Sequence, residues 1–354
     1  MALVSARWPT LILIGFLILN IQSVAAIKPL VPALLVFGDS TCDPGNNNYI
    51  QTALKSDFPP YGRDLADHQA TGRFCNGRLG IDFIAEGLGL KKTIPPYLDP
   101  HLSPHDLVTG VSFASAGTGY DNMTASILNV IPLWKEIEYF KEYQFRLKQM
   151  FGEKIASIVI NKALYLVSVG TNDFIENYLQ FPNRRLRFSP SEYVDFIVGI
   201  AGNFFEELYR LGARRISVAS LSPMGCLPML RSMNLFEPGQ CMEDYNDIGL
   251  QYNAKLQTTI ENLRHKLPGL LILFSDSYQL TYEAIYNPSK YGFEEAERAC
   301  CGSGTIELGY LCNELIPSCS DASTFVFWDS VHPTERFYEI VANNMLQSIR
   351  RLPL

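Results

Sequence analysis

The sequence predicts a three-layer α/β/α sandwich built around a central, mostly parallel sheet. Two observations favour this fold class: short, unbroken apolar runs recur along the chain, and longer amphipathic stretches separate them. Unbroken apolar strands are typical of a parallel sheet covered by helices on both faces, because neither face meets water. Strands that alternate with helices are joined by right-handed crossovers. The predicted strands are 34–37, 111–113 (the weakest), 164–169, 215–219 and 270–274.

Three helices carry clear sequence signals. One begins at Ser189-Pro190-Ser191-Glu192, a capping box with proline at the first helical position, and Gly212 stops it. A second closes on the cations of residues 264–266, which suit a helix C-terminus. A third is predicted to begin at Pro333, which would make His332 its N-cap residue. The three apolar faces are Ile197, Ile200, Phe204, Leu208 and Leu211; Tyr245, Ile248, Tyr252, Leu256, Ile260 and Leu263; and Phe337, Val341, Met345 and Ile349.

Residues 1–26 have the features of a secretory signal peptide. Arg7 gives a positive start, residues 11–19 form an apolar core, and residues 23–26 are small enough for cleavage. A membrane anchor is the alternative, but this apolar run is short for a bilayer. We therefore expect a secreted, extracellular protein without a transmembrane anchor. Residues 27–354 are expected to form one domain, because no linker or low-complexity tract interrupts them.

Composition and missing motifs exclude several function classes. The net charge of -7 argues against nucleic acid as a partner, because phosphate binding requires a basic surface. The chain has no CxxC pair, HExxH motif, GxGxxG loop or Walker loop, so we expect neither a metal nor a cofactor. His101 and His105 have a spacing that a metal site could use, but Pro104 lies between them. The sequence does not predict an oligomeric state.

The cysteines and one sequon fit a secreted protein. Eight cysteines in such a chain indicate disulfides, although spacing alone does not fix their pairing. Four of them lie within residues 300–319 and predict a local disulfide cross-link there, which we call the staple, while Cys226 and Cys241 could close a neighbouring loop. Asn122 begins a glycosylation sequon and is the predicted acceptor.

Residues able to do chemistry follow the predicted strands. Ser40, Gly117 and Asn172 come shortly after the first three strands, and Asp329 and His332 lie close together near the C-terminus. In open α/β sheets ligands bind beyond the carboxyl ends of the strands, so all five can share one rim.

Their residue types fit acyl transfer from an ester. A hydroxyl is a poor nucleophile until an oriented base takes its proton, and His332 with Asp329 could activate Ser40 in this way. The backbone N–H groups of Ser40 and Gly117 and the Asn172 amide could stabilise the resulting oxyanion. Each feature alone is typical of an ordinary turn or helix cap, and only their combination in this order predicts a serine hydrolase.

The chain resembles plant-type GDSL esterase/lipases of the SGNH hydrolase superfamily over nearly its whole mature length. The resemblance implies the flavodoxin-like fold of those hydrolases and ester hydrolysis without a cofactor. It also implies Ser40 as nucleophile, His332 as base and Asp329 as its orienting group, with Ser40, Gly117 and Asn172 as oxyanion donors. The segments that carry it are 37–40 with 43–48, 110–117, 169–173, 225–228 and 327–334, with the Cys300-Cys301 pair and Cys312.

Two positions depart from the family pattern. Ser112, in the family-like segment 110–117, stands where the family commonly has asparagine. Cys42 stands where a small apolar residue is common, and Cys75 lies in a segment that can pack near the same turn. We therefore predict a Cys42–Cys75 disulfide that pins the nucleophile loop, against the alternative of two buried free thiols.

Other functions use the same residues. Acyl transfer to a sugar or lipid alcohol needs the same three groups and differs only in the acceptor, and a non-catalytic binding protein could keep the scaffold. Asp39 and Asp173 could be mistaken for a glycosidase pair, but they more simply support the turns that present Ser40 and Asn172. The expected partner is a small-molecule or lipid ester. Aromatic and proline residues that could line its pocket, or simply pack a loop, are Tyr49, Phe58, Pro59, Pro60 and Tyr61.

Overall fold

The structure is a computed structural model, and it describes residues 29–352. The predicted signal peptide, residues 1–26, lies outside the described residues. Four parallel strands form the central sheet in the order β1-β2-β3-β4. The weakest predicted strand is reduced to isolated parallel bridges from Ser112 to Val36 and Pro96. The four strands are β1 (Leu34–Gly38), β2 (Leu164–Ser168), β3 (Arg215–Ala219) and β4 (Leu271–Ser275).

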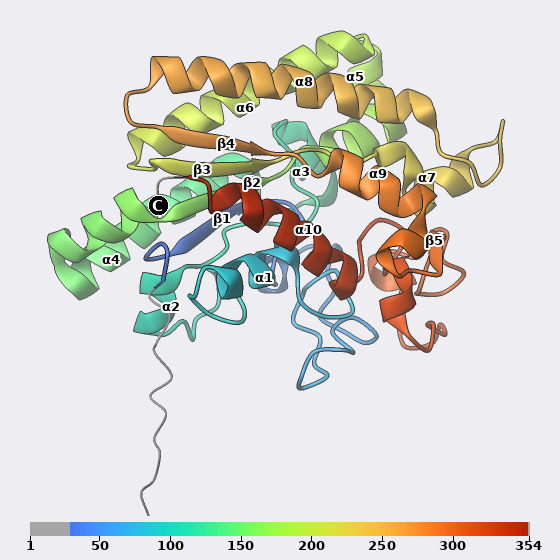
Figure 1. Cartoon of the computed structure of the whole chain (residues 1–354), viewed down its shortest axis with the longest axis horizontal. Helices are drawn as coiled ribbons and strands as arrows, with labels where there is room; N and C mark the ends of the chain where they lie inside the picture. The colour runs from blue at the N-terminus through green and yellow to red at the C-terminus, as the bar shows by residue number, and fades with distance from the viewer. Residues whose placement is uncertain (1–28, 353–354) are drawn as a thin grey trace, which may run out of the picture.

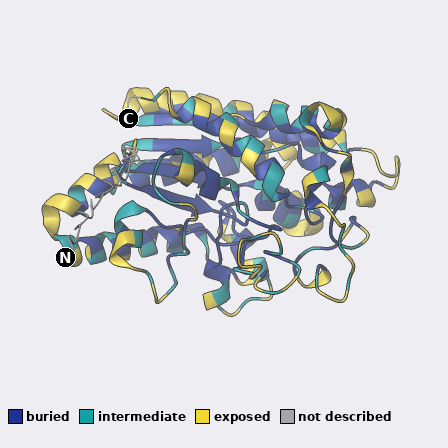
Figure 2. Ribbon diagram, turned by 60° about the horizontal axis from the view of Figure 1, so that its bottom comes forward, coloured by how far each residue is buried: buried dark blue, intermediate teal, exposed yellow. Residues whose placement is uncertain are grey.

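Helices cover both faces of this sheet, which confirms the predicted three layers (Figure 1). On β1, Leu35 and Phe37 enter one apolar core while Leu34 and Val36 enter the other. This alternation follows from the period of two in a strand, and it explains why the whole run is apolar. Figure 2 shows the result, with buried strands inside and exposed residues on the outer sides of the helices. The first core is closed by α4 (Leu133–Lys162), α6 (Pro190–Arg210) and α8 (Glu243–Lys266), and the second by α1 (Gly80–Gly87) and α10 (Glu335–Ile349).

Of the four predicted helix boundaries, three are confirmed and one is wrong, and the stop at Gly212 is among those confirmed. The Ser189 side chain accepts from Glu192 N as the capping box requires, and α8 ends on the predicted cations. However, α10 begins at Glu335, with Thr334 as its N-cap, so His332 is not a capping residue. Pro333 instead pairs with Phe327 in an antiparallel bridge, which holds it outside the helix.

Several shorter elements lie beyond the carboxyl ends of the strands. Figure 1 shows α7, α9 and β5 there, where β4 runs into α9. A second, two-stranded parallel sheet pairs β5 with β6. The shorter elements of the structure are α2 (Pro104–Thr109), α3 (Asn122–Leu128), a π-helix η2 (Asp173–Gln180), α5 (Pro182–Arg185), α7 (Pro228–Met233), α9 (Tyr278–Tyr286), β5 (Glu295–Ala299) and β6 (Phe325–Phe327), with 3₁₀ turns at Asn46–Tyr49, Met224–Cys226, Pro288–Tyr291, Gly309–Leu311 and Ala322–Thr324.

Three disulfides are present, and a fourth predicted pair is not bonded. The Cys226–Cys241 bond and the staple within residues 300–319 are confirmed. Cys42 and Cys75 are buried free thiols, so the predicted bond between them is wrong. The Cys42 thiol lies 3.5 Å from Phe37 O, and the Cys75 thiol lies 3.4 Å from Asn76 Oδ1. Each thiol thus turns toward its own loop, whereas a disulfide needs side chains that converge.

No helix within residues 29–352 combines the length and the apolar composition that a membrane crossing requires.

Candidate active site

Ser40 lies in a tight turn directly after β1. Gly38 opens this turn with a φ of 134°, which favours glycine, and its N–H donates to the buried Glu136 carboxyl at 2.9 Å. Asp39 closes the turn by accepting from the N–H of Thr41 at 3.0 Å and from its hydroxyl at 2.8 Å. Burial raises the pKa of Asp39 to about 6. The turn is therefore held on both sides, and it fixes Ser40 at the carboxyl edge of the sheet.

The structure brings Ser40, His332 and Asp329 together in one chain of hydrogen bonds. His332 Nε2 lies 2.7 Å from Ser40 Oγ, although the two residues are 292 positions apart. His332 Nδ1 lies 2.9 Å from each oxygen of Asp329. Asp329 is fully buried, and Ser40 and His332 are 7% and 3% exposed. The imidazole is thus held by one nitrogen and faces the hydroxyl with the other.

Asp329 also organises its own loop. Its Oδ1 accepts from the N–H groups of Val331 at 2.9 Å and His332 at 2.7 Å, and Trp328 N donates to His332 O at 2.7 Å. The ring of Phe74 packs on His332 with 4.9 Å between centroids. These contacts leave the imidazole little freedom to turn.

Tyr61 supports the Ser40–His332–Asp329 hydrogen bonds through Asp329, and the sequence did not predict that role. Its hydroxyl donates to Asp329 Oδ2 at 2.8 Å and accepts from Gly309 N at 2.9 Å. Sequence analysis placed Tyr61 among possible pocket-lining aromatics, but it is 1% exposed and lines neither of the two cavities that meet at Ser40. A tyrosine 268 residues from Asp329 gives no sequence signal of this contact.

The Asp329–His332 loop rests on the cross-linked segment 300–319. The N–H groups of Cys300 and Cys301 donate to Phe327 O at 3.0 Å and Trp328 O at 2.9 Å. Two disulfides, Cys300–Cys319 and Cys301–Cys312, close this segment on itself. The predicted cross-linked segment therefore lies directly beside the Asp329–His332 loop.

Gly117 and Asn172 reach the same place from two other segments. The Asn172 amide donates one hydrogen to Thr118 O at 2.9 Å, which orients the group and leaves its other hydrogen available. Gly117 has a φ of 83°, and a Cβ there would collide with Leu54 and Leu128. No hydrogen bond among residues 29–352 occupies the N–H groups of Ser40 and Gly117.

Two cavities meet at Ser40, Asn172 and His332. We call the one of about 130 Å³ beneath α1 and α10 the inner cavity, and the one of about 300 Å³ beside Gly117 the outer cavity. The inner cavity has mainly aliphatic and aromatic walls, which include Ile81, Ile84, Leu166, Phe327, Phe337 and Met345. The outer cavity has the remaining walls Leu54, Phe74, Gly117, Ile127, Leu128, Ile175, Glu176, Gln180, Phe181, Met229, Ile306, Leu308, Leu311 and Val331.

The buried acids near the site support the backbone. Asp173 accepts from Tyr120 N at 2.8 Å, Asp121 N at 3.0 Å and the Thr124 hydroxyl at 2.6 Å, and burial raises its pKa to about 7. It therefore holds the start of α3. The prediction that it holds the turn of Asn172 is wrong. Asp39 does hold the Ser40 turn.

Ser112 supports the family-like segment 110–117 despite its departure from the usual asparagine. Its hydroxyl donates to Cys42 O at 2.7 Å and accepts from Ala114 N at 3.2 Å. Asn46 adds a bond from its amide to Ser112 O at 2.9 Å. Of the other aromatic and proline residues expected near the pocket, Tyr49, Phe58, Pro59 and Pro60 line neither cavity.

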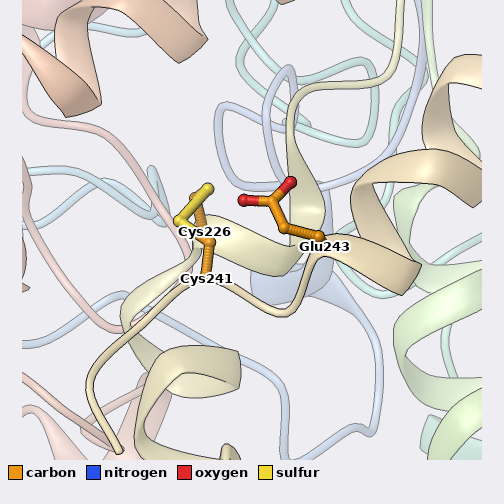
Figure 3. A group of neighbouring side chains, drawn as sticks. All are labelled: Cys226, Cys241 and Glu243. Carbon is orange, nitrogen blue, oxygen red and sulfur yellow. A yellow bond between two sulfur atoms is a disulfide. The ribbon is translucent and has the colours of Figure 1, made fainter. Parts of the chain in front are cut away.

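One cluster of sulfur and carboxylate side chains lies at the start of α8. Within the described residues, it brings together Cys226, Cys241 and Glu243 (Figure 3). Its two sulfurs are bonded to each other, so they are not thiolates and do not bind a metal as a pair. His101 and His105 are both exposed, and the His101 imidazole lies 3.2 Å from Asp99.

Asn122, the predicted glycosylation acceptor, is the first residue of α3, and its side chain is exposed.

Two comparisons at the level of sequence agree on one family. The sequence model of the GDSL-like lipase/acylhydrolase family matches residues 34–345. Two GDSL esterase/lipases of Arabidopsis thaliana are 51% and 50% identical over 338 and 334 residues. These alignments cover 94% of this chain and 96% and 95% of the relatives. Among solved structures, a catalytic mutant of an acetylxylan esterase from Geobacillus stearothermophilus matches 92% of this chain and 96% of its own, with 16% identity and a TM-score of 0.41.

Proposed function

This chain belongs to the GDSL-like lipase/acylhydrolase family, and from that premise we propose that it cleaves carboxylic esters through an acyl-enzyme on Ser40. Membership makes it a serine hydrolase of ester bonds, and the residue roles, the mechanism and the substrate are the proposal. The observation that carries it is the 2.7 Å contact between His332 Nε2 and Ser40 Oγ, with Nδ1 held by Asp329. In this arrangement the hydroxyl faces a base whose orientation is fixed.

The first half-reaction forms the acyl-enzyme. Ser40 Oγ attacks the ester carbonyl while its proton moves to His332 Nε2, and Asp329 stabilises the imidazolium. The oxyanion accepts from the N–H groups of Ser40 and Gly117 and from the free hydrogen of the Asn172 amide. When the intermediate collapses, the bond to the alcohol oxygen breaks and His332 returns the proton to that oxygen.

The second half-reaction releases the acid. His332 takes a proton from water, the hydroxide attacks the acyl carbonyl, and Ser40 Oγ leaves with the proton from His332. An alcohol in place of water would give acyl transfer with the same groups. The assembled Ser40–His332–Asp329 chain favours either reaction over a purely binding role, which needs no oriented base.

We also propose that the mature protein is residues 27–354, one domain, acting outside the cell. Three disulfides support this location, because such bonds persist in oxidising compartments. The exposed side chain of Asn122 is compatible with glycosylation on the secretory route. N-terminal sequencing of protein recovered from the medium tests the cleavage, and retention of residues 1–26 would contradict it.

The catalytic proposal is tested with p-nitrophenyl butyrate and a fluorophosphonate probe. We expect the wild-type protein to hydrolyse the ester and to take up one probe per chain, because the probe reacts with activated serines. Ser40→Ala should lose both properties while its thermal unfolding midpoint stays close to the wild-type value. Turnover or labelling that survives in Ser40→Ala would show that another group is the nucleophile.

A further inference from the structure

The outer cavity contains one acidic side chain, Glu176, that the proposed mechanism does not use. Glu176 lies in the π-helix η2, one turn after Asn172. Glu176 and Asn172 both line the outer cavity.

The Glu176 carboxyl has an oxygen without a partner. Its Oε2 is inaccessible to solvent, and no donor within residues 29–352 pairs with it. A buried polar oxygen in this state is costly unless a ligand completes it. Burial, and then the charges of Asp39 and Asp173, raise the pKa of Glu176 to about 8. The carboxyl is therefore largely protonated at neutral pH, and it can both donate to and accept from a hydroxyl group.

The positions of the two cavities indicate which half of an ester meets Glu176. The alcohol leaves after the first half-reaction, while the acyl group stays bonded to Ser40, so the alcohol needs the side that opens to solvent. The outer cavity has that character, because Phe181, Ile306 and Leu311 on its wall are 40%, 55% and 55% exposed. The smaller inner cavity has mainly buried apolar walls and suits an acyl chain.

We propose that Glu176 is a specificity-determining residue that hydrogen-bonds a free hydroxyl on the alcohol half of the substrate. The preferred substrates are then partial esters of a polyhydric alcohol, with the acyl group in the inner cavity. This inference rests on the proposed ester hydrolysis at Ser40.

The test compares esters that share one acyl group. Glycerol 1-monobutyrate carries free hydroxyls on its alcohol, and ethyl butyrate carries none. We expect Glu176→Leu to lower the ratio of kcat/KM for these two substrates by about 10-fold, the worth of one hydrogen bond. Glu176→Gln should lower it less, because an amide still donates and accepts. Glu153→Leu, a change of an exposed glutamate on α4 that lines neither cavity, should leave the ratio at the wild-type value.

Further substrates exclude other kinds of recognition. Ethyl 3-hydroxybutyrate places the hydroxyl on the acyl half, and butyrylcholine replaces it with a cation. A ratio that does not respond to Glu176→Leu, or a loss confined to either of these two esters, would overturn the proposal. If Glu176→Leu fails to fold, Glu176→Met decides by the same ratio, because it keeps the length of the side chain and removes both of its oxygens.

The outcomes separate this inference from its premise. Ser40-dependent hydrolysis of ethyl butyrate with an unresponsive ratio refutes only the role of Glu176. Failure of the wild-type protein to hydrolyse any of the four esters refutes ester hydrolysis itself, and the role of Glu176 with it.

Discussion

The Asp329→Asn substitution tests whether the carboxylate sets the proton position on His332. All the contacts that Asp329 makes are with donors or with the imidazole: Val331 N and His332 N at Oδ1, and the Tyr61 hydroxyl at Oδ2. An asparagine must place its NH₂ group at one of these two oxygens. The two backbone donors cannot turn away, whereas the tyrosine hydroxyl can rotate, so the NH₂ group takes the Oδ2 position.

This placement of the NH₂ group moves the proton of the neutral imidazole from Nδ1 to Nε2. His332 Nδ1 lies 2.9 Å from the Oδ2 position, so an N–H there stabilises the tautomer that carries its proton on Nε2. That proton would point at Ser40 Oγ, 2.7 Å away, so Nε2 could not accept the proton of the serine hydroxyl. We expect kcat to fall by about 10⁴-fold, the loss typical of this tautomer change in a serine triad.

The assay is hydrolysis of p-nitrophenyl butyrate, with circular dichroism and thermal unfolding as checks on the fold. Ser40→Ala sets the background rate. A folded Asp329→Asn protein within 10-fold of wild-type kcat would refute the reasoning, because Nδ1 would then be oriented without the carboxylate.

Three further predictions follow from the same contacts. Asn172→Ala should lower kcat by about 10²–10³-fold, the usual loss for one oxyanion donor, and full activity would remove it from that role. Tyr61→Phe should lower kcat by about 10-fold at nearly constant KM, because the charged Asp329 carboxylate loses the hydrogen bond from the tyrosine hydroxyl. An equal change in kcat and KM would contradict this prediction. Burial raises the pKa of Glu136 well above its ordinary value of 4.5, so the stability it contributes is present below that value and is lost as pH rises toward the folded pKa. Glu136→Gln keeps an acceptor for Gly38 N and should flatten the fall in unfolding free energy as pH rises above 4.5 in guanidinium titrations; an unchanged slope would count against it.

Much of the fold was predictable because its signals are local. The four strands of the sheet are apolar runs with definite ends, and the capping box at Ser189 encodes its own helix start. The start of α10 was not predictable in this way, since Pro333 and Thr334 both fit a helix beginning. A contact with Phe327 on β6 decides between them, and such a contact is tertiary.

The site shows the same division. Motif order pointed to Ser40 and His332, because strand ends in this fold share one rim. Motif order could not provide Tyr61, since its contact with Asp329 depends on how a distant loop packs. Proximity also misled the prediction for Cys42 and Cys75, because bonding depends on side-chain direction, which the sequence does not record.

The cross-linked segment beside the base affects how the protein should be produced. Ser40 lies on a sheet that needs no oxidation to form, while the Asp329–His332 loop rests on a segment closed by the Cys300–Cys319 and Cys301–Cys312 bonds. A chain made in a reducing cytosol can therefore complete its helices and strands and still lack an ordered His332, the proposed general base. Its specific activity should track the loss of free thiols during oxidation, while its helical content barely changes.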